Sequence, residues 1–120
     1  MVTGGNATVY IKNMDAAVAF YTEVLGMKLS ARYGDHWATV EAGQFTIGLH
    51  PQSEKAPAPG TAGSIQVGLL VEDIEAARSK AASGGALQVG DVVKGDGGSF
   101  VNFQDPCGNQ LYFWQMPKWD

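Results

Sequence analysis

Side chains suited to binding a small molecule recur at every second position of several short stretches of this sequence. The positions are Asn6, Thr8, Tyr10, Trp37, Thr46, Gly48, His50, Gln66, Tyr112 and Trp114. Successive side chains of a strand point to opposite faces, and apolar residues such as Val9 and Phe113 fill the intervening positions. The aromatic and polar face carries few charges, which favours a semi-enclosed cavity over a surface open to water. We therefore predict a ligand-binding site whose rings stack against a planar or cationic molecule.

Two side chains on or near this face are candidates for proton transfer. His50 shares the face of Gly48, and an imidazole can serve as an acid or a base. Glu41 alternates with Trp37 on one stretch. Pro51 follows His50 directly and Gly43 follows Glu41 closely, so a solvated strand end and a solvated charge are the competing interpretations. The catalytic role therefore stays open, with His50 and Glu41 as the candidates.

The elements that position these residues follow the order βαβββ in the first half of the chain. Alternation predicts a strand over 7–12. Apolar residues at spacings of three and four predict a helix from Met14 to Leu25, capped by Asn13 and stopped at Gly26. Three further strands are predicted over 27–33, 36–42 and 44–50, with turn glycines between them.

The second half repeats this order. The predicted elements are a strand over 64–71, a helix over 74–83 capped by Asp73, and strands over 86–93, 99–103 and 110–115. An offset of 60 residues aligns 11–17 with 71–77 without a gap, which indicates an internal duplication. The segment 51–63, rich in Pro and Ala, is the predicted linker between modules 6–50 and 64–116 of a single domain. The predicted fold class is α+β: two tandem βαβββ modules form curved mixed sheets around a cavity, with helices on the outer faces.

Composition excludes several classes of partner. The chain has 120 residues, a formal net charge of −4 and no cluster of Lys or Arg, so nucleic acid and anionic membranes are poor partners. No apolar run is long enough to span a membrane, and we expect no signal peptide. Cys107 is the single cysteine, which is compatible with the cytoplasmic location that we predict.

Two segments resemble the signatures of a known superfamily. The segment "AAVAFYTEVLGMKL" (16–29) is similar to the FY-x-x-x-LG-x-x signature of the glyoxalase, bleomycin-resistance and extradiol-dioxygenase superfamily, also called vicinal oxygen chelate proteins. The segment "FVNFQDPCGNQLYF" (100–113) is similar to its F-x-DP-x-GN signature. The resemblance covers nearly the whole chain and implies the superfamily's fold of paired βαβββ modules.

The resemblance also bears on metal binding. In metal-dependent members, each module supplies a His or Gln ligand from its first strand and a Glu ligand from its last. The matching positions here are Asn6, Gly48, Gln66 and Tyr112. None is a carboxylate or an imidazole, which hold a divalent ion against water, so we predict neither a metal nor a cofactor. A displaced site built from His36, His50 and Glu41 is the alternative.

Three interpretations of function follow from the resemblance. The leading hypothesis is a metal-free binder of a small molecule, which sequesters an antibiotic or another planar ligand as metal-free resistance proteins of the superfamily do. The first alternative is a metal-dependent lyase or dioxygenase with a displaced metal site. The second is an association module with a vestigial cavity. Because members of the superfamily commonly pair and an open sheet leaves strand edges, we also predict a homodimer.

Overall fold

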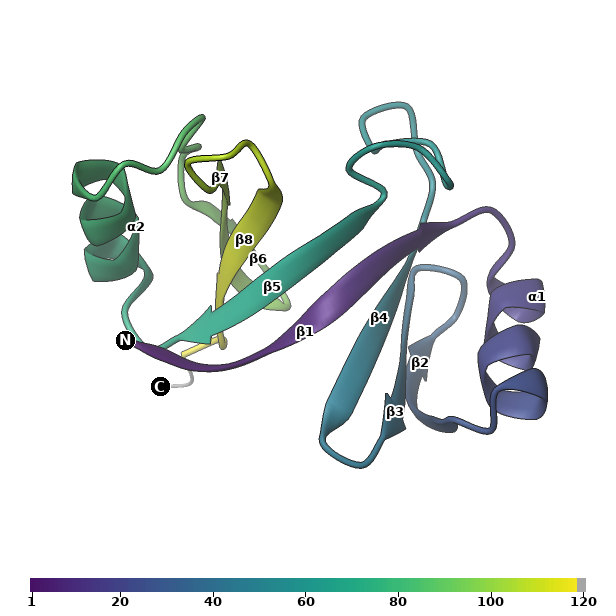
Figure 1. The fold of residues 1–120 in the computed structure, drawn as a ribbon. Helices are drawn as coiled ribbons and strands as arrows, with labels where there is room; N and C mark the ends of the chain where they lie inside the picture. Colours follow the sequence, from purple (N-terminus) through teal and green to yellow (C-terminus); the bar gives the residue numbers. More distant parts are fainter. Residues whose placement is uncertain (119–120) are drawn as a thin grey trace. The chain divides into compact units, whose positions relative to one another are not determined.

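The protein is mostly sheet, with two α-helices. The computed structural model describes residues 1–118, and within them the chain forms eight strands, two α-helices and one π-helical segment (Figure 1). The chain divides into two compact units. The first unit is Asn6–Gln66, and the second unit combines Met1–Gly5 with the chain from Val67 onward. The strands pair both in parallel and antiparallel, so the predicted α+β class with mixed sheet is confirmed.

The first unit has the predicted βαβββ order. Its elements are β1 (Val2–Ile11, which begins in the second unit), α1 (Met14–Ala19), the π-helix η1 (Phe20–Val24), β2 (Lys28–Tyr33), β3 (Trp37–Ala42) and β4 (Phe45–Pro51). The hydrogen-bonded order of the strands is β2-β3-β4-β1, with β1 parallel to β4. Met14 and Val18 of α1 pack against Ala38, Val40 and Leu49, which are fully buried. The apolar positions of the strands therefore face the helix.

The second unit repeats this topology. Its elements are β5 (Ile65–Val71, of which Ile65 and Gln66 belong to the first unit), α2 (Ile74–Ser83), β6 (Val93–Gly95), β7 (Gly98–Gln104) and β8 (Gln110–Gln115). The strand order is β5-β8-β7-β6, with β5 parallel to β8. Ile74 and Ala77 of α2 pack against Val101, Phe103 and Phe113. The two units thus share one arrangement of strands and helix, as expected for a duplicated sequence.

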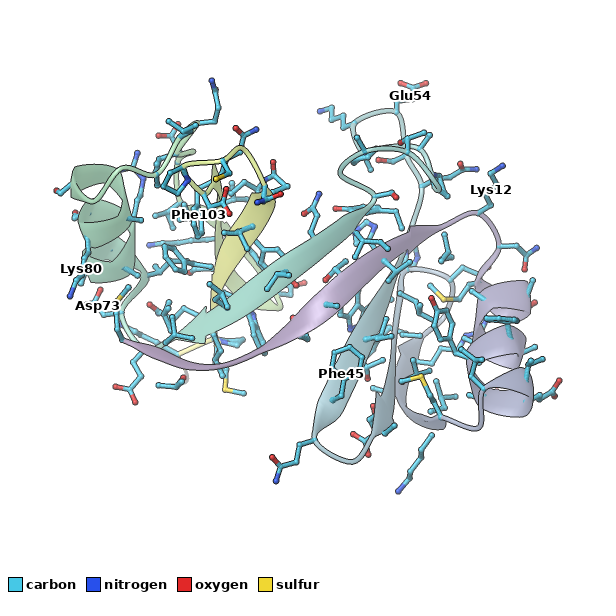
Figure 2. All side chains as sticks on the ribbon, viewed as in Figure 1. Lys12, Phe45, Glu54, Asp73, Lys80 and Phe103 are labelled. Atoms are coloured by element: carbon cyan, nitrogen blue, oxygen red, sulfur yellow. The ribbon has the colours of Figure 1, made fainter. Side chains whose placement is uncertain are left out.

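Both helix starts are capped as predicted. The backbone N–H of Ala16 donates to Oδ1 of Asn13 at 2.9 Å, and the N–H of Ala76 donates to Oδ1 of Asp73 at 3.1 Å. Figure 2 shows Asp73 at the start of α2. A second donor of α2 is satisfied from a distant strand, because the N–H of Ile74 donates to Oε1 of Gln115 at 2.8 Å. The two residues are 41 positions apart, so no local pattern predicts this contact.

The segment predicted as a helix from Met14 to Leu25 is helical through Val24, but its second half is a π-helix and not an α-helix. The α-helix ends at Ala19, and η1 widens the turn so that the N–H of Leu25 donates to the carbonyl of Phe20 at 3.1 Å. Val24 and Leu25, at the end of this turn, are 69% and 53% exposed. Gly26 ends the segment in the left-handed region, as predicted, with φ +74°.

The strand predicted over 86–93 is also wrong. Regular pairing is confined to Val93–Gly95, and only an isolated bridge joins Leu87 to Gln104. Gln88 has φ +49°, which breaks the extended backbone, and Nε of Arg78 donates to the carbonyl of Gly90 at 2.7 Å. Ala86, Val89 and Val92 are partly buried and pack against the core of the second unit, so their hydrophobicity reflects this packing and not a strand. Leu87 and Val93 are exposed.

Alternation overestimated how far the helices cover the strands. Phe45, labelled in Figure 2, is 55% exposed, and Ile65 and Val67 are 65% and 45% exposed. Each lies on a strand face predicted to pack under a helix. Alternation identifies the face of a strand but not the length of the helix that covers it.

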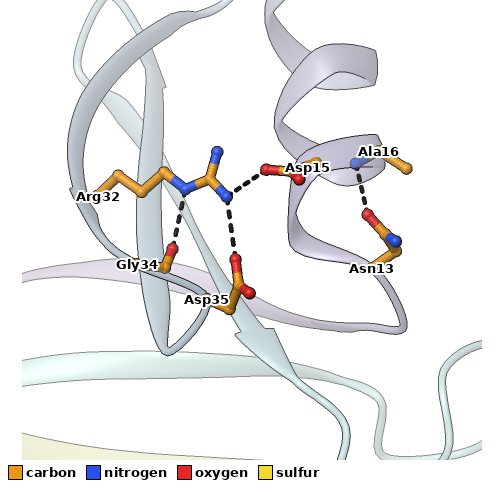
Figure 3. A network of polar contacts seen from close by, with 6 residues as sticks. All are labelled: Asn13, Asp15, Ala16, Arg32, Gly34 and Asp35. Carbon is orange, nitrogen blue, oxygen red and sulfur yellow. Dashed lines mark hydrogen bonds and ion pairs between the residues drawn. The ribbon is translucent and has the colours of Figure 1, made fainter.

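A polar network joins the end of β2 to the start of α1 within the first unit (Figure 3). One guanidinium nitrogen of Arg32 donates to Asp15 at 2.5 Å and to Asp35 at 3.1 Å, and Nε donates to the carbonyl of Gly34 at 2.9 Å. The hydrogen bond to Asp15 is the main cause that raises the pKa of Arg32 above its ordinary value. The network anchors the helix to the sheet edge on the side opposite the aromatic face.

Candidate functional site

An aromatic row crosses the strands of the first unit on the face that points away from α1. We define this row as Tyr10 on β1, His50 on β4 and Trp37 on β3. Tyr10 and His50 are register partners, with ring centroids 5.0 Å apart and planes inclined at 51°. His50 and Trp37 meet edge to face at 6.2 Å and 72°. Three of the predicted ligand-binding residues therefore lie in contact through their rings.

The neighbouring row on this face is made of small residues. Thr8 on β1 and Thr39 on β3 both pair with Gly48 on β4. The indole of Trp37 lies across Gly48, and a Cβ placed on that glycine would come within 2.6 Å of Cζ2 of the ring. The Trp37 ring therefore occupies the space that a side chain at position 48 would fill. The atoms that meet this Cβ belong to the six-membered ring of the indole.

His50 is held in a defined orientation at the end of β4. Its Nδ1 lies 2.8 Å from the carbonyl oxygen of Pro51, and the side chain is half-buried between the Tyr10 and Trp37 rings. The backbone contact and the two rings fix the imidazole without any charged partner in the aromatic row. Glu41, the other candidate for proton transfer, lies farther along β3, where it pairs with Thr46 and with Lys28.

The second unit carries a corresponding row on the face that points away from α2. Trp114 on β8 pairs with Leu70 on β5 and with Phe100 on β7. Nε1 of Trp114 donates to the carbonyl of Gly97 at 2.9 Å, in the turn between β6 and β7. A Cβ on Gly98 would lie 3.0 Å from the same nitrogen. Trp114 therefore stabilises the β6–β7 hairpin through this hydrogen bond. This is a structural role for a residue that was predicted to bind ligand.

Tyr112 repeats the arrangement of Trp37 in a different register. Its ring covers Gly68, its partner on β5, and a Cβ on that glycine would come within 2.6 Å of Cε2. Asn102 on β7 pairs with Tyr112 from the other side. In each unit, one aromatic ring thus occupies the space above a strand glycine, where a side chain would otherwise stand.

The remaining predicted residues lie on the same strands with less distinctive surroundings. Asn6 on β1 and Thr46 on β4 are half-buried, and Thr8 is only 4% exposed. Gln66 on β5 is 9% exposed, and its amide nitrogen donates to the carbonyl of Gly63 at 3.0 Å. This contact ties Gln66 to the preceding loop.

Two pockets lie elsewhere in the units, and none of the ten predicted ligand-binding residues lines either one. A pocket of about 170 Å³ in the first unit is lined by Lys12, Asp15, Asp35 and Pro51, among others. A pocket of about 310 Å³ in the second unit lies beside Thr3, Leu70, Glu72 and Met116.

The turn in the second signature segment has a structural explanation. Oδ1 of Asp105 accepts hydrogen bonds from the N–H groups of Cys107 and Asn109, and Oδ2 accepts from the Asn109 side chain, all at 2.9 Å. The side-chain hydrogen bond from Asn109 is the main cause that lowers the pKa of Asp105 below its ordinary value. Cys107 is exposed, and the carboxylate beside its backbone gives the thiol no activating base. The segment closes a hairpin.

Sequence reasoning missed two aromatic neighbours of the predicted site. Tyr33 on β2 pairs with Trp37 and is 67% exposed, which extends the aromatic row towards the sheet edge. Phe100 on β7 pairs with Trp114. The sequence pattern of each strand does not show that these two rings lie beside the predicted residues. That proximity depends on the register in which the strands pair.

The side chains at the four metal-ligand positions do not fit a divalent ion. Gly48 offers no donor and lies beneath the Trp37 ring, while the amide of Gln66 is turned to the carbonyl of Gly63. Asn6 and Tyr112 contribute a neutral amide and a phenol, which are weak ligands compared with carboxylate or imidazole. Among residues 1–118, no group of three or more His, Cys, Asp or Glu side chains is arranged to hold a metal ion.

Known proteins are similar to this chain in sequence and in fold. The chain is 33% identical over 108 residues to an uncharacterized protein of Mycolicibacterium smegmatis, covering 89% of this chain and 88% of the relative. A hypothetical protein from Bacillus halodurans has a similar structure, with TM-score 0.77 and 17% identity over 98% of this chain and 96% of that one. Methylmalonyl-CoA epimerase from Mycobacterium tuberculosis matches with TM-score 0.75 and 18% identity, over 98% and 90% of the two chains. At these identities the structural matches establish the fold alone.

The family assignment comes from the sequence match. The family model described as glyoxalase/bleomycin resistance protein/dioxygenase superfamily matches residues 5–113, which span both units and both signature segments. The same topology recurs in the two units of the structure. The chain therefore belongs to the glyoxalase/bleomycin resistance protein/dioxygenase superfamily.

Proposed function

We propose that this protein binds a planar small molecule on the aromatic row of the first unit, without a metal ion. The observation that carries this proposal is the contact of three rings from three strands, Tyr10, His50 and Trp37. The hydrophobic core of the first unit forms on the opposite face of its strands, where they pack against α1. The aromatic row is therefore not needed to build that core. Flat rings stack favourably on this row, and a cation gains from the electron-rich faces of Tyr and Trp.

An antibiotic is a suitable ligand of this kind, so sequestration of a drug is the specific function that we propose. Support comes from the donor chemistry at Asn6, Gly48, Gln66 and Tyr112, which suits binding better than Lewis-acid catalysis. The alternative enzyme, a lyase or dioxygenase with a displaced metal, requires a site built from residues such as His36, His50 and Glu41. Elemental analysis after growth with added Ni, Zn, Fe and Mn tests that alternative, and stoichiometric metal would favour it.

The direct test is titration of the protein with a panel of planar drugs, including bleomycin-like cationic ones. Nuclear magnetic resonance of a ¹⁵N-labelled sample should show the Trp37 indole N–H and the backbone of β4 shifting as ligand is added. Replacing Trp37 by Ala should weaken binding about fivefold to tenfold, since one stacked ring contributes about 1 kcal/mol or more. Phe20→Ala, which removes a ring that is 50% exposed on η1, is the matched control and should leave affinity unchanged. A panel that shifts none of these resonances would refute the proposal.

We also propose that the protein is a homodimer. Several large apolar side chains are exposed, among them Phe45, Ile65 and Val24, and β2 and β6 each end a run of paired strands. Burying such residues and covering such edges stabilises association. Light scattering tests this, because a monomeric mass contradicts it. The cytoplasmic location stays a prediction that cell fractionation tests. No helix within residues 1–118 has the length and apolar character needed to span a membrane.

A further inference from the structure

The hydrogen bond at the end of β4 determines which nitrogen of His50 carries a proton. The carbonyl oxygen of Pro51, 2.8 Å from Nδ1, can only accept a hydrogen bond. Nδ1 is therefore protonated, and in the neutral ring Nε2 keeps its lone pair. A backbone carbonyl that holds one nitrogen in this way fixes both the tautomer and the orientation of the ring.

The second ring nitrogen takes no part in this hydrogen bond. Within the imidazole, Nε2 lies farther from the backbone than Nδ1 does. Tyr10 and Trp37 flank the imidazole on the two neighbouring strands, and both contact it through their rings. The hydrogen bond that holds the ring engages Nδ1 and not Nε2. The aromatic row thus contains one oriented hydrogen-bond acceptor between two stacking surfaces.

We infer that the ligand of this site is a planar ring bearing an O–H or N–H donor, and that Nε2 of His50 accepts that hydrogen bond. This inference rests on the proposed function and narrows it to phenols and N–H heteroaromatic molecules. An analogue with a methyl group in place of the proton stacks equally well but leaves Nε2 without a partner. Losing one such neutral hydrogen bond in a half-buried site weakens binding by about tenfold.

Matched pairs of simple probes test the inference. The pairs are 2-naphthol with 2-methoxynaphthalene, and indole with 1-methylindole, each titrated into the full-length ¹⁵N-labelled protein. The buffer and its pH are the same in every titration, so the two members of a pair differ only in the donor. The donor member of each pair should bind about tenfold more tightly than its methylated partner. Only the donor member should also shift the ¹⁵N resonance of His50 Nε2, which a purely structural role of His50 would not produce.

Two variants separate the hydrogen bond from the stacking. His50→Phe keeps a flat ring but removes the acceptor, so it should bind both members of a pair with the affinity of the methylated one. His50→Gln keeps an acceptor oxygen and should recover part of the preference for the donor. Equal affinity within both pairs, with shifts at Tyr10 and Trp37, would overturn this inference and leave the proposed function standing. Probes that shift no resonance of the aromatic row would overturn both.

Discussion

Replacing Gly48 by Ala should lift the indole of Trp37 off the sheet and destabilise the protein. The new methyl group would stand within 2.6 Å of Cζ2 of Trp37, far inside ordinary van der Waals contact. Overpacking of this kind typically costs about 1–3 kcal/mol in the free energy of unfolding, because the ring must leave its preferred position. The same displacement should weaken ligand binding on the aromatic row, since Trp37 would no longer align with His50.

A double-mutant cycle identifies the cause. With Trp37 already replaced by Ala, the Gly48→Ala change should be neutral or slightly stabilising, because Ala loses less backbone entropy than Gly on folding. The measurement is urea denaturation followed by circular dichroism, at matched slopes for all four proteins. Gly95→Ala is the control: a Cβ there meets nothing within 4 Å, so its effect should be small. An equal cost of Gly48→Ala in both backgrounds would refute the placement of the ring on Gly48.

Three further predictions concern the frame that holds the site. Leu49→Ala, at a fully buried position, should lower the free energy of unfolding by about 2–5 kcal/mol in urea denaturation. Leu25→Ala, at a position that is 53% exposed, should lower it far less. Equal losses would contradict the placement of Leu25 after the π-helical turn. Gln115→Ala should cost about 1 kcal/mol in the same assay by removing an acceptor of the first N–H of α2, and unchanged stability would contradict that contact. The lowered pKa of Asp105 means that its carboxylate contributes stability above the ordinary value of 3.8 and loses it as the pH falls through the folded pKa. The stability gap between the wild type and Asp105→Asn should therefore close in acid, and a gap that persists there would contradict the role of Asn109 as hydrogen-bond donor to the ionised form.

Local rules predicted the starts of both helices correctly, because capping depends on neighbours in sequence. Asn13 and Asp73 each lie three residues before the N–H that they accept. The same rules failed over 86–93, where an apolar pattern is compatible with either a strand or an irregular, partly buried segment. Beyond Ala19 they predicted a helix but not its π-helical turn, which leaves no periodic signal in so few residues.

The candidate site was predicted as a set of residues but not as an arrangement. Alternation placed Tyr10, Trp37 and His50 on one type of strand face, and it placed Trp114 there equally well. The structure distinguishes their roles. Nε1 of Trp114 donates a hydrogen bond to the carbonyl of Gly97, while the His50 ring contacts those of Tyr10 and Trp37. The residues next to Trp114 in sequence do not predict its hydrogen bond, because Gly97 lies 17 residues away in the chain.

The sequence by itself determined the fold class, the duplication and the face on which each strand carries its rings, since helix caps and alternation act between near neighbours in the chain. Tertiary structure alone decided the register that aligns Tyr10 with His50, the seat of Trp37 on Gly48, and the proton on Nδ1 of His50. The physical reason is that register and side-chain contact require distant segments to pair, and a shift of one residue would turn every ring to the opposite face.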